Sequence, residues 1–208
     1  MKKCNWKKVI QLAGAIVLGL YFSCLTTSCS ESDEEKSEFD NWQERNETYF
    51  NEVYNRAKNS SSSEWAVYTK WSLNDDVAAN PKDHIVVQVL ERGTGSGCPL
   101  YTDSVRIHYS GRLMPTASYA QGYEFDKSWT DSYNPAVSKP LTSVVNGFVD
   151  GFSTAIMNMH IGDRWRVYIP YQLGYGTTAS GSIPAYSTLI FDLTLVAYNH
   201  PGAGVPNW

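Results

Sequence analysis

Hydrophobic side chains in the first part of this 208-residue chain follow a helical spacing. Many of them lie three, four or seven positions apart among polar residues, at Phe39, Trp42, Tyr49, Phe50, Val53 and Ala57. This spacing gathers them on one side of an α-helix, and the serine run at 60–63 ends the pattern. We therefore expect an amphipathic helix whose apolar side packs against its own domain, with docking to a partner as the alternative.

Further along, apolar residues alternate with polar ones or form short β-branched and aromatic runs, as is typical of β-strands. Such segments occupy 64–73, 84–97, 104–113, 137–149, 164–170 and 187–198. The segment 150–163 instead has the pattern of a short helix, which Gly162 is placed to close. The pattern predicts an α+β fold in which a twisted antiparallel β-sheet wraps around one short helix. The helix at 39–57 is then an N-terminal extension.

The N-terminal residues have the features of a bacterial lipoprotein signal peptide. A basic start precedes an apolar run at 9–22, which is too short to span a membrane comfortably, and small residues follow it. Cys29, directly before an acidic run, is the preferred lipidation site; Cys24 and a plain secretory signal are the alternatives. We predict a cell-envelope protein, lipid-anchored to the outer membrane on its periplasmic or surface-exposed face.

These patterns divide the chain into a signal peptide at 1–28, an acidic tether at 29–37, the helical extension at 38–84 and a main domain at 85–200. The formal net charge of −4 gives no sign of a nucleic-acid partner. The histidines are scattered and no cysteine pair occurs, so we expect neither a metal site nor a cofactor. Ser153 lies in a helical segment without the second glycine of a nucleophile elbow. Cys98 is expected to be a small buried side chain.

Five sequence blocks resemble, in order and with compatible spacing, the signature blocks of the FKBP-type peptidyl-prolyl cis-trans isomerases. They are VRIHYSGRL, GYEFDKS, GFVDGFSTAIMNMHIGDRWRVYIP, LGYG and SIPAYSTLIFDLTLV, and the resemblance covers about residues 85–198. It implies an isomerase that accelerates rotation about X-Pro bonds in envelope or surface proteins without a cofactor. Proline-containing peptide segments and macrolides are the implied ligands. The N-terminal helix is a candidate for dimerisation, because lipoprotein members of the family often carry such an extension.

The resemblance also assigns roles to residues, motif by motif. It gives catalytic roles to Tyr109, Asp126 and Tyr175, with the Tyr175 hydroxyl donating to a substrate carbonyl and Asp126 orienting a neighbouring hydroxyl. It gives substrate binding to a mostly aromatic set: Phe125, Phe148, Val149, Phe152, Ile183 and Phe191. Phe152 then takes the place of the tryptophan at the pocket floor. An alternative register makes Val144 and Val145 the pair before the helix and Phe148 the floor, but it needs an insertion in the helix.

Two departures from the family pattern bear on activity. Phe152 keeps an aromatic floor but lacks an indole N–H. A second aromatic residue that the family usually supplies has no clear match, and Lys139 stands near its place, so one pocket wall is expected to be open or polar. A proline-peptide-binding or chaperone module with little catalytic activity is therefore the alternative function, and a surface scaffold is a third.

Overall fold

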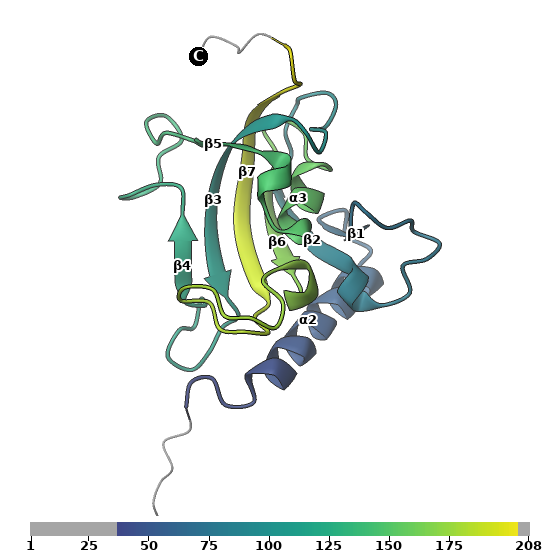
Figure 1. The fold of residues 1–208 in the computed structure, drawn as a ribbon, viewed down its shortest axis with the longest axis vertical. Coiled ribbons are helices and arrows are strands. Elements are labelled where there is room, and N and C mark those ends of the chain that lie inside the picture. The colour runs from purple at the N-terminus through teal and green to yellow at the C-terminus, as the bar shows by residue number, and fades with distance from the viewer. Residues whose placement is uncertain (1–36, 204–208) are drawn as a thin grey trace, which may run out of the picture. The chain divides into compact units, whose positions relative to one another are not determined.

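Seven antiparallel strands form one sheet that curls around a short helix (Figure 1). The computed structural model describes residues 37–203. The strand order is β1-β2-β6-β7-β3-β4, and β5 pairs with β3 beside β4. The predicted α+β fold is confirmed. Its elements are α2 (Trp42–Asn59), β1 (Trp65–Thr69), β2 (His84–Glu91), β3 (Ser104–Leu113), β4 (Glu124–Lys127), β5 (Leu141–Val144), α3 (Asp150–Ile156), β6 (Arg164–Ile169) and β7 (Leu189–Asn199), with 3₁₀ turns η1 (Pro81–Asp83), η2 (Val145–Gly147) and η3 (Tyr171–Leu173).

Alternation along the strands gives the sheet two different faces. On β7, Phe191, Leu193 and Leu195 point to the face that packs against α3, which we call the inner face. Ile190 points to the opposite, outer face, where it joins Tyr168. Each face thus has its own apolar core, and each core is covered by one helix.

Helix α2 covers part of the outer face. Its buried Phe50, Val53 and Ala57 pack on the outer core, so the expectation that this helix packs on its own domain is correct. The fully buried Asn46 fastens the helix to the sheet, because its side-chain oxygen accepts the backbone N–H of Thr188 at 2.7 Å. Its side-chain amide donates to the carbonyl of Trp42 at 2.7 Å. A buried amide that is satisfied on both sides fixes the position of the helix.

The structure differs from the predicted pattern at several places. Strand β4 lies in a stretch that the pattern indicates as a loop, because four residues are too few to show alternation. In the predicted strand 137–149, only Leu141–Val144 is extended, and η2 follows directly. Strand β1, from the predicted extension, pairs along its whole length with β2. The sheet therefore crosses the predicted boundary between residues 84 and 85.

Helix α3 and Cys98 also differ from the predicted pattern. Helix α3 ends at Ile156, and turns lead from there to Gly162, whose φ of 92° suits glycine. Cys98 is half-buried rather than buried, with its Sγ 3.9 Å from Nε2 of His160. The signal peptide, Cys24, Cys29 and the tether before Ser37 lie outside the described residues. No helix within 37–203 is long and apolar enough to cross a membrane.

Candidate active site

A cavity of about 240 Å³ lies between α3 and the inner face of the sheet. Its floor is Phe152 on α3, only 3% exposed, and its wall Phe191 on β7 stands edge-on at 4.8 Å between ring centroids. Phe148, just before α3, lies 4.7 Å from Phe152. The complete lining is Tyr109, Phe125, Asp126, Gly147, Phe148, Val149, Phe152, Tyr175 and Phe191. Six of these nine residues are Tyr or Phe, from β3, β4, β7, the α3 region and the segment after η3, so rings from separate elements enclose one space.

A glycine on β3 lets these rings meet. Alternation places Tyr109 and Gly111 on the same inner face of β3. A Cβ atom on Gly111 would lie 2.6 Å from ring atoms of both Phe125 and Phe191. Without a side chain there, the two rings approach over the strand to 5.6 Å between centroids. The YSG motif therefore supplies one ring and leaves room for two others.

The polar side of the cavity is a hydrogen-bonded pair. The hydroxyl of Tyr109 donates to Oδ2 of Asp126 at 2.6 Å, and the other carboxylate oxygen accepts the backbone N–H of Lys127 at 2.8 Å. Burial, followed by the hydrogen bond to Asp126, raises the pKa of Tyr109 above its usual range. The Tyr109 hydroxyl therefore keeps its proton at neutral pH and holds the Asp126 side chain in one orientation.

Val149 places a backbone donor at the cavity. It is the N-cap of α3 in an extended conformation, and its carbonyl accepts the N–H groups of Phe152 and Ser153 at 2.9 and 3.0 Å. Its own N–H has no hydrogen-bond acceptor among residues 37–203. A ligand carbonyl in the cavity can fill that role.

The structure brings together eight of the nine residues that the resemblance assigns. Tyr175 lies at the rim, 44% exposed. Ile183 is the exception: it is buried in the inner core, where its backbone bridges to Ser180, and it does not line the cavity. Gly147 also lines the cavity. It was not among the predicted site residues, because a glycine contributes only backbone atoms and has no side chain that would indicate a role. Of the alternative register, Val145 is fully buried and Val144 is exposed, and neither lines the cavity.

Other candidate chemistry is absent from the described part of the chain. Residues 37–203 contain no group of three or more His, Cys, Asp or Glu residues that could hold a metal ion. The hydroxyl of the fully buried Ser153 donates to the carbonyl of Val145 at 2.7 Å, so it is occupied in the core.

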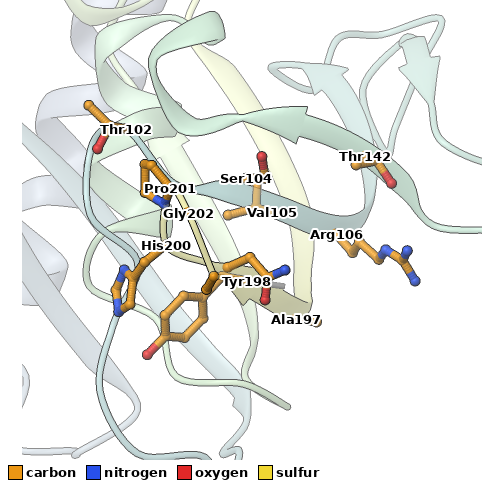
Figure 2. Close-up of a pocket in the computed structure, with 12 residues that line it drawn as sticks. Thr102, Ser104, Val105, Arg106, Thr142, Ala197, Tyr198, His200, Pro201 and Gly202 are labelled. Carbon is orange, nitrogen blue, oxygen red and sulfur yellow. The ribbon is translucent and has the colours of Figure 1, made fainter. Parts of the chain in front are cut away.

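A second cavity, of about 320 Å³, lies where β3 begins and β7 ends (Figure 2). Figure 2 shows His200 and Tyr198 on one side of it and Arg106 on the other. The imidazole Nδ1 of His200 lies 2.8 Å from the carboxylate of Asp103, which is fully buried. Polar side chains such as Ser104, Arg106 and His200 border this cavity together with apolar ones, whereas aromatic rings make up most of the lining of the other cavity.

The aromatic cavity, enclosed by the wrapped sheet and α3, has the size and the apolar rings to hold a small apolar group. Residues 98–196 match the model of the FKBP-type peptidyl-prolyl cis-trans isomerases, and this segment of the chain belongs to that family. Among curated relatives, the macrophage infectivity potentiator of Trypanosoma cruzi is 38% identical over 121 residues, 58% of this chain and 56% of the relative. FkpA of Aeromonas hydrophila is 37% identical over 120 residues, 58% of this chain and 40% of the relative. The chain thus spans about half the length of these relatives.

Solved structures share the fold. FkpA from Escherichia coli aligns with a TM-score of 0.54 and 22% identity, covering 95% of this chain and 73% of FkpA. A peptidyl-prolyl cis-trans isomerase from Pseudomonas syringae aligns with a TM-score of 0.53 and 23% identity, covering 76% of this chain and 96% of its own. At this level of identity, the likeness concerns the fold alone.

Proposed function

We propose that this protein is a peptidyl-prolyl cis-trans isomerase that binds the twisted X-Pro amide in the aromatic cavity. The observation that supports this most directly is that six aromatic rings line one small space, with the Tyr109–Asp126 pair at its edge. In this proposal, Tyr109, Asp126 and Tyr175 have the catalytic roles. Phe125, Phe148, Val149, Phe152 and Phe191 bind the proline ring and its acyl group, and Ile183 supports the loop 177–182 from the core.

The physical chemistry of the amide explains how such a cavity can act. Rotation of a prolyl amide faces a barrier of roughly 18–20 kcal/mol, because the C–N bond has partial double-bond character. At the twisted transition state this conjugation is lost, and the carbonyl depends less on water. An apolar cavity that excludes water stabilises the twisted form relative to the planar one. The unpaired N–H of Val149 and the rim hydroxyl of Tyr175 are placed to hold substrate carbonyls while the bond turns.

The substrates that we propose are proline-containing segments of envelope or surface proteins, and macrolides are the corresponding inhibitor class. We further propose that Cys29 carries a lipid anchor to the outer membrane. A dimer through the N-terminal helix stays a prediction. It would have to use the solvent-facing side of α2, because Phe50, Val53 and Ala57 are already buried against the sheet. Sedimentation of the purified protein at several concentrations tests it.

The proposal is tested by magnetisation-exchange NMR on a Leu-Pro or Phe-Pro peptide with catalytic amounts of protein. Acceleration of cis-trans exchange above the uncatalysed rate supports it. Exchange at the uncatalysed rate, together with failure to bind a macrolide, contradicts it. Binding of the peptide without acceleration identifies the alternative, a proline-peptide-binding or chaperone module, which the non-aromatic Lys139 favours.

A further inference from the structure

A third space, a hollow of about 490 Å³, adjoins the aromatic cavity, and Tyr109 lines both of them. The rest of its lining comes from the end of β4 and the segment that enters β5: Lys127, Ser128, Lys139, Pro140, Leu141 and Thr142. Two of these side chains carry ammonium groups and none carries a carboxylate. We call this space the lysine hollow. Because Tyr109 borders both spaces, a residue next to a proline in the aromatic cavity can reach the lysine hollow past the Tyr109 ring.

The charges around the lysine hollow do not cancel. The Nζ of Lys127 lies 2.9 Å from Glu124, but the same carboxylate also pairs with Arg112 at 2.7 Å. One carboxylate shared by two cations leaves one positive charge. Lys139 is exposed and forms no ion pair with any residue in 37–203. This positive surplus stands out on a chain whose formal net charge is −4.

The Asp126 carboxylate does not line the hollow. Asp126 lines the aromatic cavity, and its two oxygens already accept the Tyr109 hydroxyl and the Lys127 backbone N–H. It is therefore held at the boundary between the two spaces and is not among the residues that line the hollow. The methylene groups of a longer side chain can contact Pro140 and Leu141, while its end reaches the ammonium groups.

We infer that the lysine hollow is a subsite for an acidic side chain next to the substrate proline, so that the protein prefers Glu or Asp in that position. The inference rests on the proposed isomerase function and specifies its substrate class. Lys139 is the specificity-determining residue, since its charge is not shared with a carboxylate. Both lysines are solvent-accessible, so the effect is that of a surface ion pair, and it is screened by salt.

The test compares peptides that differ only in the charge of one residue beside the proline. Glu and Gln are isosteric, and each is placed before the proline in one peptide pair and after it in another. We expect kcat/KM for the Glu peptide to exceed that for the Gln peptide by about two- to five-fold in at least one pair, which is the range of an exposed ion pair. The ratio should approach one in Lys139→Gln, fall below one in Lys139→Glu, and shrink in 1 M salt.

A matched control is Lys82→Gln, which removes the same charge from an exposed lysine in η1 that lines neither space. It should leave the Glu-to-Gln ratio of the wild type unchanged. The inference is overturned if the Glu-to-Gln ratio is near one in both peptide pairs, or if Lys139→Glu does not change this ratio. In either case, acceleration of the Gln peptides still supports the proposed isomerase function. If no peptide is accelerated, the proposed function fails. In that case, the dissociation constants of the Glu and Gln peptides are compared instead, and their ratio shows whether the protein prefers the acidic residue.

Discussion

Strands β3 and β7 line two cavities that differ in the side chains that border them. The one at the start of β3 and the end of β7 is the larger, about 320 Å³, and is bordered by Thr102, Ser104, Arg106 and His200 among others (Figure 2). The one between the middle of β3 and the beginning of β7 is about 240 Å³ and is bordered mainly by aromatic rings. The same two strands therefore build an aromatic cavity and one bordered by polar as well as apolar side chains, which we call the polar cavity after Arg106 and His200.

We expect the side chains that border a cavity, rather than its size, to decide whether it can accept a twisted amide. A polar lining keeps ordered water, which stabilises the planar, strongly hydrated amide. Rings that hold each other in place, as Phe152 does with Phe148 and Phe191, offer the twisted amide a dry surface that does not reorganise. We expect substitutions in the two cavities to separate activity from stability.

The largest effect is expected from Phe152→Ala in the floor of the aromatic cavity. Phe152 is almost fully buried, so truncation should cost about 3–5 kcal/mol of unfolding free energy. In the proposed mode of binding the proline ring rests on Phe152, so kcat/KM should fall about 10- to 100-fold. Denaturant titration and the exchange assay measure the two losses.

The matched control for this prediction is Phe152→Leu, which keeps an apolar floor and should lose less on both measures. If Phe152→Ala stays folded and retains full activity, the ring does not belong to the binding surface. Measuring below the melting temperature of each variant keeps the loss of activity separate from unfolding.

An intermediate effect, on stability alone, is expected from His200→Ala in the polar cavity. Asp103 is fully buried, and its carboxylate contacts the imidazole of His200 and accepts the backbone N–H of Leu100 at 2.7 Å. Loss of the imidazole should therefore cost about 1–3 kcal/mol. The exchange rate per folded molecule should not change. A loss of activity at preserved stability would show that this cavity takes part in the reaction.

Much of the fold and site is predictable from local sequence, because the period of apolar residues decides which face of an element is buried. The strand 104–113 and its inward Tyr109 are found in this way, and the ordered motifs place Phe152 and Phe191 around the same space. Properties that depend on long-range packing cannot be predicted from local sequence. Ile183 turns into the core instead of the cavity, and Lys139, which the family pattern places near a wall of the aromatic cavity, lines the adjoining lysine hollow instead.

The smallest effect on stability is expected from Tyr109→Phe. This variant also tests the polar edge of the aromatic cavity. The ring and its apolar contacts remain, while the hydrogen bond to Asp126 is lost. We expect stability to fall by about 0.5–1.5 kcal/mol, and kcat/KM to fall by about two- to ten-fold as Asp126 loses its orientation. Asp126→Asn, which keeps the shape of the side chain, should lower activity by a similar factor, and the double variant should lose little more than either single one.

The pH dependence of the wild type distinguishes orientation from proton transfer. Because the pKa of Tyr109 is raised, the hydroxyl stays protonated beyond about pH 10, where an ordinary tyrosine ionises. Its contribution to stability is therefore complete below that pH and is lost only as the pH rises through the higher folded-state pKa. Exchange rates measured between pH 7 and 10 should show no titration from Tyr109. A fall in kcat/KM within this range that disappears in Tyr109→Phe would mean that the hydroxyl ionises during the reaction instead of holding Asp126 in place.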